Sequence, residues 1–169
     1  MTTESYAKED HREAVNNAER ATAQFIAFQV DDREYGIDIL SVREIRGWSP
    51  VTGVPNSPNE VLGIVNLRGA IVPIIDLKAC FGDGTTDIAK SNVVVIVRIE
   101  HHVVGLVVDA VSDILSVNPS AIQPMPELQG GGAKLVPQII NYEGRLLGVL
   151  DLSRIMDLDK LEGVAATVQ

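Results

Sequence analysis

An internal repeat is the feature that most limits what this chain can fold into. Residues 64–77 align without gaps on residues 139–152, at an offset of 75 residues. Asn, Gly, Asp and Leu recur at the same places in the two segments, together with the pattern of apolar residues. A weaker similarity, at an offset of 69 residues, relates 35–45 to 104–114. Turn and polar positions recur as well as apolar ones, which favours duplication over chance similarity between Val- and Ile-rich strands.

The repeat predicts two copies of one small, mainly β unit. Hydrophobic residues make up 46% of the chain but aromatic residues only 4%, so Val, Ile and Leu supply the apolar mass and favour strands. A unit of about five short strands buries little surface alone, so we expect two units to share a core. Gly69 and Gly144 are predicted to take positive φ in equivalent hairpin turns. Pro73 and Gly148 share one repeat position and predict a bend or bulge there.

The polarity of the chain suggests its organisation. The first residues are polar and predict a disordered tail or a frayed helix. The apolar spacing over 39–45 predicts a short helix that ends near Glu44. Asp151 or Ser153 is suited to be the N-cap of a last helix. The expected segments are a tail over 1–20, a patterned domain over 21–160 with subdomains at about 21–88 and 89–150, a C-terminal helix at about 151–161, and a tail over 162–169.

Composition excludes several classes of protein. The formal net charge of −9 argues against nucleic acid and against an anionic membrane surface as partners. The apolar run over 93–97 is too short for a membrane span, and the start of the chain lacks the apolar core of a secretory signal. Cys80 is the lone cysteine, which excludes an internal disulfide and a cysteine-based zinc site. We therefore expect a cytoplasmic protein without direct membrane insertion.

No catalytic constellation emerges from the sequence. His101 and His102 are adjacent in a predicted turn, Cys80 has no motif around it, and the Gly-rich run at 130–132 lacks the spacing of a phosphate-binding loop. The carboxylates form no recognisable acid/base pair. We expect no enzyme, no cofactor and no metal, and hence an interaction module. A small enzyme with an unrecognised site is the alternative class.

Glu44 and Arg68 stand out as a pair of charged residues on the predicted surface. As isolated solvated charges, they would add only about 0–1 kcal/mol to folding. Their other interpretation is a polar mark on an otherwise apolar groove. Spacing in the sequence does not choose between the two.

Three ordered motifs give the chain a resemblance to a known family. Residues 35–47, 63–77 and 103–113 resemble the three motifs of the CheW-like family of bacterial chemotaxis coupling proteins. The similarity covers roughly residues 24–158. It implies two tandem SH3-like five-stranded β-barrel subdomains with short helices. It also implies a non-catalytic adaptor that links the cytoplasmic tip of chemoreceptors to the regulatory domain of the histidine kinase CheA, at membrane-associated receptor arrays.

The resemblance also implies site residues. An apolar strip with a few oriented polar groups suits a helical receptor tip. Further copies of the adaptor are expected in ring-like arrays, and a pathway other than chemotaxis, such as twitching motility or gene regulation, is the alternative role. The expected receptor-binding residues are Val42, Glu44, Gly63, Arg68, Val93 and Val94. The expected kinase-binding residues are Trp48, Val51 and Gly53 on one subdomain, and Gln123, Glu127 and Leu128 on the other.

Overall fold

The structure is a computed structural model that describes residues 22–126 and 134–155. The predicted tails and most of the predicted C-terminal helix lie outside these residues. The short helical elements are η1 (Ile39–Ser41), α2 (Leu77–Cys80), η2 (Pro119–Ala121) and η4 (Leu152–Arg154). The strands are β1 (Ala23–Val30), β2 (Arg33–Asp38), β3 (Val42–Gly47), β4 (Val61–Leu67), β5 (Ala70–Asp76), β6 (Val93–Ile99), β7 (His102–Val108), β8 (Ala110–Val117), β9 (Ile122–Pro124), β10 (Gln138–Tyr142) and β11 (Arg145–Val149).

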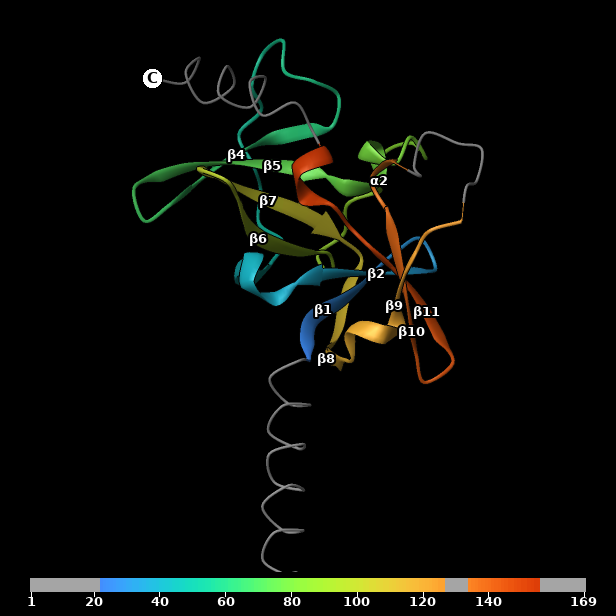
Figure 1. The fold of residues 1–169 in the computed structure, drawn as a ribbon. Coiled ribbons are helices and arrows are strands. Elements are labelled where there is room, and N and C mark those ends of the chain that lie inside the picture. Colours follow the sequence, from blue (N-terminus) through green and yellow to red (C-terminus); the bar gives the residue numbers. More distant parts are fainter. Residues whose placement is uncertain (1–21, 127–133, 156–169) are drawn as a thin grey trace, which may run out of the picture.

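The strands form two sheets (Figure 1). The six-stranded sheet has the order β8-β1-β2-β11-β10-β9, and the five-stranded sheet has the order β3-β6-β7-β5-β4. Neighbouring strands are antiparallel except β2 with β11 and β5 with β7, which are parallel. The prediction of a mainly β fold in two packed halves is confirmed.

Each of the two sheets contains strands from both repeats. Hairpin β1–β2 pairs with β8 and β11, whereas hairpin β6–β7 pairs with β3 and β5. The register follows the repeat: Ile74 pairs with Gly105 in one sheet, and their equivalents Val149 and Gly36 pair in the other. The sheets are therefore not divided at residue 88, since β6 and β7 lie beyond it and complete the sheet of β3–β5. Division of the chain into two subdomains there stays a prediction.

Three apolar clusters make up the core. The central cluster lies between the sheets and takes residues from both, such as Phe28 and Ile37 from one sheet and Val95 and Leu106 from the other. Each sheet also curls around a cluster of its own. Because side chains alternate along a strand, β6 serves two clusters, with Val95 in the central one and Val94 in the other. The expected shared core is thus present.

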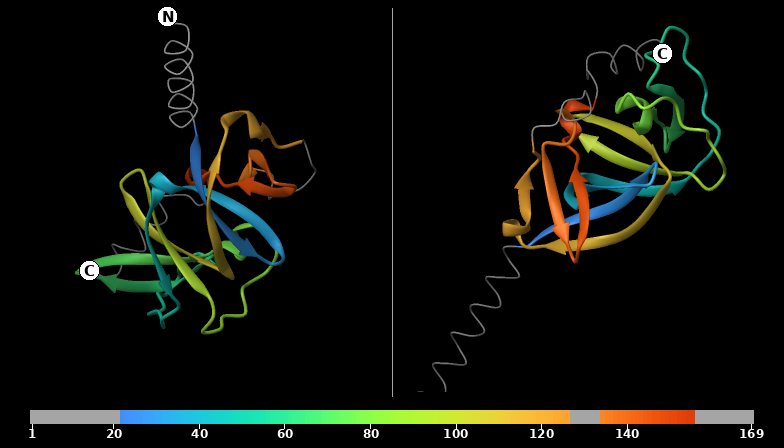
Figure 2. Two further views of the ribbon diagram at one scale, coloured as in Figure 1. Left: turned by 90° about the horizontal axis from the view of Figure 1, so that it is seen from below. Right: turned by 90° about the vertical axis from the view of Figure 1, so that its right-hand side faces the viewer.

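The hairpin turns are equivalent in the two repeats. Gly69 and Gly144 have φ of 87° and 81°, as predicted, and the residues before them, Arg68 and Glu143, also have positive φ of 52° and 49°. Two consecutive residues at positive φ form the kind of two-residue turn that suits the twist of a hairpin. Hairpins β4–β5 (green) and β10–β11 (orange to red) project toward opposite sides of the molecule (Figures 1 and 2).

One expectation about local structure was wrong, and two others are not confirmed. The predicted helix over 39–45 is a single 3₁₀ turn followed by strand β3, because pairing with β6 overrides the helical spacing of the apolar residues. Register irregularities occur near Phe28, Glu44 and Gly63, so the pairing shows no bulge at Pro73 or Gly148, and the bend that was the other possibility there stays a prediction. Closed barrels are not detected among the described strands, because β3 and β4 at the edges of one sheet, and β8 and β9 at the edges of the other, are not paired with each other. None of the helices in the described residues is both long and apolar enough to span a bilayer.

Candidate functional site

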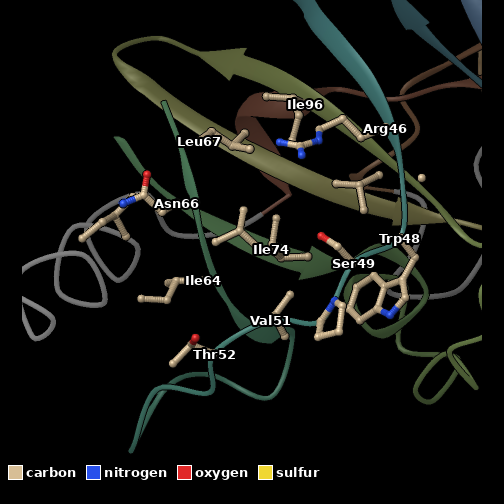
Figure 3. A pocket seen from close by; sticks show the side chains of 15 residues that line it. Arg46, Trp48, Ser49, Val51, Thr52, Ile64, Asn66, Leu67, Ile74 and Ile96 are labelled. Atoms are coloured by element: carbon tan, nitrogen blue, oxygen red, sulfur yellow. The ribbon is translucent and has the colours of Figure 1, made fainter. Parts of the chain in front are cut away.

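The gap between the edge strands β3 and β4 holds a cavity of about 460 Å³ (Figure 3). Its apolar floor comes from the strands between these edges, with Ile74 on β5 and Val94 and Ile96 on β6. One wall carries Arg46 and the other Asn66. The remaining lining residues are Gly47, Trp48, Ser49, Pro50, Val51, Thr52, Ile64, Val65, Leu67 and Ile71.

An ion pair bridges β3 and the β4–β5 turn. Nη2 of Arg68 lies 3.3 Å from Oε2 of Glu44. The carboxylate of Glu44 also lies 3.7 Å from Nε of Arg46. One carboxylate thus serves two guanidinium groups, which leaves local positive charge on a chain with a net charge of −9.

The segment Trp48–Thr52 closes the cavity at the end away from the Glu44–Arg68 pair. The N–H of Thr52 donates to the carbonyl of Ile64 at 2.9 Å, and the N–H of Ile64 donates to the carbonyl of Thr52 at 2.8 Å. Gly63 permits this approach, because a Cβ there would lie 2.4 Å from the Thr52 carbonyl oxygen. The N–H of Trp48 donates to the carbonyl of Asn92 at 3.0 Å, which holds the indole beside the cavity.

The structure brings together part of the predicted receptor-binding set. Glu44, Arg68 and Val94 lie at or beside the cavity, and Gly63 shapes it through Thr52. Val42 and Val93 are half-buried and pack against the central cluster instead. Cross-strand pairing explains the division, since Glu44 is opposite Ile96 and Arg46 is opposite Val94, whereas Val42 is opposite Val97 of the central cluster.

The predicted kinase-binding residues divide in a similar way. Trp48 and Val51 are half-buried and line the same cavity as Val94, and Gly53 is exposed beside them. Gln123 is exposed on β9 and pairs with Ile139. In the other sheet, Thr52 pairs with Ile64, which is the repeat equivalent of Ile139. Glu127 and Leu128 lie outside the described residues. Trp48 and Val51 of the predicted kinase-binding set and Val94 of the predicted receptor-binding set are therefore contiguous.

Sequence reasoning missed several lining residues, Arg46 and Leu67 among them. Both lie in segments that the sequence had already singled out, since Arg46 comes two residues after Glu44 and Leu67 directly precedes Arg68. The position of Arg46 on a strand was not recognised, because the apolar spacing of the residues just before it predicts a helix. Without the strand, nothing placed Arg46 opposite Val94.

A second charge cluster joins three strands of the other sheet. Nε and Nη2 of Arg145 donate to the two carboxylate oxygens of Glu34, each at 3.0 Å, and Nη1 donates to Asp113 at 3.4 Å. These hydrogen bonds, with Glu34 first, raise the pKa of Arg145. Asp113 is the repeat equivalent of Glu44, so each sheet has a carboxylate at this place facing an arginine of a distant hairpin.

Two further polar side chains, those of Asp76 and Cys80, contribute to the structure rather than to a reactive site. The buried carboxylate of Asp76 accepts hydrogen bonds from the backbone and hydroxyl of Thr86 and from the backbone of Lys78. Burial raises the pKa of Cys80 to about 12, which keeps the thiol protonated and a poor nucleophile. Within residues 22–126 and 134–155, no three His, Cys, Asp or Glu side chains are grouped to hold a metal. An open apolar cavity with a charged rim suits binding of another protein.

Comparisons with known proteins identify the family to which the chain is similar. The sequence model of the family described as CheW-like domain matches residues 24–160. A probable chemotaxis protein CheW of Rhizobium etli is 48% identical over 143 residues, which are 84% of this chain and 92% of that protein. A chemotaxis protein CheW of Rhizobium meliloti is 39% identical over 82% of this chain and 90% of its own length. The crystal structure of the scaffolding protein TtCheW from Thermoanaerobacter tengcongensis superimposes with a TM-score of 0.74 at 29% identity, covering 82% of this chain and 90% of that one.

Proposed function

The chain belongs to the CheW-like domain family, and from this premise we propose that it joins a chemoreceptor tip to the regulatory domain of the kinase CheA through the surfaces around the β3–β4 cavity. It is a chemotaxis coupling protein and acts as a non-catalytic adaptor. The observation that carries the proposal of the site is the pairing of Arg68 with Glu44 across a gap that the backbone leaves open.

The receptor surface in this proposal is narrower than the sequence suggested. It consists of Arg68, Glu44 and the cavity floor at Val94, which together offer an apolar strip with oriented charges. Such a strip matches the needs of an amphipathic helical partner. Gly63 shapes the surface, and Val42 and Val93 support it from the core.

Two separate places are proposed for the kinase. One is the segment around Trp48, Val51 and Gly53, which continues from the receptor surface. The other is at Gln123 on β9, in the other sheet, and extends to Glu127 and Leu128. Because Gln123 and Thr52 occupy equivalent pairing positions, the two kinase contacts would use related parts of the two sheets. Such quasi-equivalent surfaces suit ring-like assemblies with the kinase and with further copies of this chain, at membrane-associated receptor arrays in the cytoplasm.

The alternative role, in twitching motility or gene regulation, predicts a different receptor specificity. The relatives at 48%, 39% and 37% identity are all named as chemotaxis proteins, which supports the chemotaxis role. Receptor fragments from each type of pathway, tested side by side, distinguish the two roles. Selective binding to the chemotaxis receptor is the expected result.

The test of the site is binding by the purified chain to an immobilised receptor fragment and, separately, to the kinase regulatory domain. Arg68→Asn is expected to weaken receptor binding and to leave kinase binding intact. Glu143→Asn is the matched control, because Glu143 holds the equivalent turn position at a φ of 49°. If both variants bind the receptor like the wild type, the receptor surface is not at Arg68. If the wild-type chain binds neither partner, the adaptor role itself is wrong.

A further inference from the structure

Two buried polar side chains hold the segment that leads into β6. Among the residues that the structure describes, Asp76 and Asn92 are the only buried ones with a carboxyl or an amide group in the side chain. The carboxylate of Asp76 accepts from the N–H of Thr86 at 2.7 Å, and the side-chain oxygen of Asn92 accepts from the N–H of Ala89 at 2.8 Å. Buried polar groups are costly to the fold unless they are paired, so two of them at one segment call for a physical reason.

Every polar group of Asn92 has a partner. Its backbone N–H donates to the carbonyl of Ala89 at 3.0 Å, and its side-chain Nδ2 donates to the carbonyl of Val108 at 3.1 Å. Its own carbonyl accepts from the N–H of Trp48 at 3.0 Å. Asn92 thus joins three places to one another: the segment before β6, the end of β7 and the residue that follows β3.

The repeat explains Asp76 but not Asn92. Asp76 and its equivalent Asp151 both cap the helical turn that follows them, so each repeat uses an aspartate at this place. The equivalent of Asn92 is Ala23, at the matching position of β1. Alanine offers no side-chain hydrogen bond, and the six-stranded sheet forms without one. The amide of Asn92 is therefore not a requirement of the fold.

The residue that Asn92 pairs with is a tryptophan that packing alone holds less firmly than its equivalent. In the other repeat, the place of Trp48 is taken by Val117, which is only 2% exposed and packs inside its sheet. Trp48 is half-buried and packs at the side of the cluster of the five-stranded sheet, as do Val51 and Ile88. Its hydrogen bond to Asn92 lies just beyond the last pair of β3 and β6, where strand pairing opens most easily. The side chain of Asn92 fixes this end of the ladder.

We propose that Asn92 is a positioning residue of the kinase contact, which holds Trp48 in place for the regulatory domain of the kinase. This inference rests on the proposed kinase contact at Trp48, Val51 and Gly53. Asn92 is buried and does not line the cavity, so it acts through Trp48. A tryptophan that is ordered before binding spares the entropy of ordering it at the interface, and tryptophans often carry much of the binding energy.

Asn92→Ala gives the five-stranded sheet the residue of the other repeat. We expect this variant to fold, to shift the emission of Trp48, the one tryptophan of the chain, to longer wavelength, and to weaken binding of the kinase regulatory domain by about tenfold. Binding to the receptor fragment should change much less. Asp151→Ala is the control, because it also removes side-chain hydrogen bonds to a backbone N–H and a hydroxyl but does not touch the cavity. It should lower Tm and leave the emission and the kinase affinity unchanged.

A double variant shows whether Asn92 acts through Trp48. Trp48→Ala should weaken kinase binding, and adding Asn92→Ala to it should weaken binding little further, because the side chain that Asn92 positions is gone. Two independent contacts would instead give additive losses. Isothermal titration calorimetry measures the affinities of the wild-type chain, the two single variants and the double variant for the kinase domain.

Each outcome decides the inference. Additive losses, or a folded Asn92→Ala variant with the kinase affinity of the wild type, would overturn it and leave the proposed kinase contact in place. A Trp48→Ala variant with wild-type affinity would place the kinase contact elsewhere and overturn both. If Asn92→Ala does not fold, Asn92→Asp decides, since a protonated carboxyl can donate to Val108 and accept from Ala89 as the amide does. Its kinase affinity, relative to the wild type at the same pH, should recover as the pH is lowered, and absence of recovery would overturn the inference.

Discussion

The guanidinium of Arg68 lies 3.3 Å from the carboxylate of Glu44, across a gap between two edge strands that no backbone ladder closes. The pair is poorly suited to stabilise the fold, because exposed ion pairs contribute only about 0–1 kcal/mol. Arg68 also has a φ of 52°, a left-handed conformation that most side chains disfavour. The hairpin turn requires this conformation in both repeats, with Glu143 at a φ of 49°, so the weak contribution of the ion pair to stability, and not the φ of Arg68, favours recognition.

Replacement of Arg68 should therefore separate function from stability. Asn tolerates the left-handed conformation better than Arg, so Arg68→Asn should change the unfolding free energy by less than about 1 kcal/mol. The same variant should lower receptor-dependent kinase activation. Thermal unfolding and kinase activity in reconstituted assemblies measure the two effects. A parallel fall in Tm and activation would instead make Arg68 a structural residue.

Gly63 should be needed for the shape of the cavity. A methyl group at this position meets the Thr52 carbonyl, so Gly63→Ala should push the Trp48–Thr52 segment away from β4 and cost about 1–3 kcal/mol. Trp48 emission should move to longer wavelength as the indole becomes more exposed. Gly47→Ala is the control, because a Cβ there has nothing within 4 Å. Equal effects of the two substitutions would show that the close contact of Gly63 is not what matters.

The two repeats should differ in how much their capping aspartates contribute. Asp76→Ala leaves the buried Thr86 hydrogen bonds without an acceptor, and we expect it to cost about 2–3 kcal/mol. Its repeat equivalent Asp151 caps Ser153 in a more exposed place, so Asp151→Ala should cost about 1 kcal/mol. Urea unfolding followed by circular dichroism measures both losses. A larger loss for Asp151 would contradict the assigned importance of burial.

Cys80 should be unreactive in the folded chain. Burial is the main cause that raises its pKa from 9.0 to about 12, with Glu60 and Asp76 adding to it. At pH 8, a thiol-specific reagent should label the folded chain much more slowly than the urea-unfolded chain. Because the folded-state pKa is the higher one, the thiol's contribution to stability is complete below about pH 9 and is lost as the pH rises toward 12. Labelling at equal rates in both states would contradict the buried position.

The repeat allowed much of the architecture to be predicted, because turn chemistry is local. Gly69 and Gly144 were predicted with the correct sign of φ, and Asp151, one of two candidates with Ser153, is the N-cap of the short η4. Strand exchange was not predictable in the same way. Whether β3 pairs with its own repeat or with the hairpin β6–β7 depends on contacts between residues far apart in sequence, which periodicity does not encode.

The candidate site, like the fold, could be predicted from the sequence only in part. Glu44 and Arg68 were chosen from the sequence as a surface pair, and the structure places them in contact. Val93 and Val94 were assigned to one surface, although neighbouring residues of a strand point to opposite faces. Their separation follows from the strand alone and could have been anticipated. The cavity itself could not, since it depends on the gap between β3 and β4.

The most direct test of the adaptor role is whether the chain makes the receptor capture the kinase domain. A receptor fragment is immobilised, the kinase regulatory domain is supplied at fixed concentration, and the purified chain is titrated. The account predicts that capture of the kinase domain rises with the chain, passes through a maximum, and falls when excess chain saturates both partners separately. Capture that does not depend on the chain at any concentration would contradict the account.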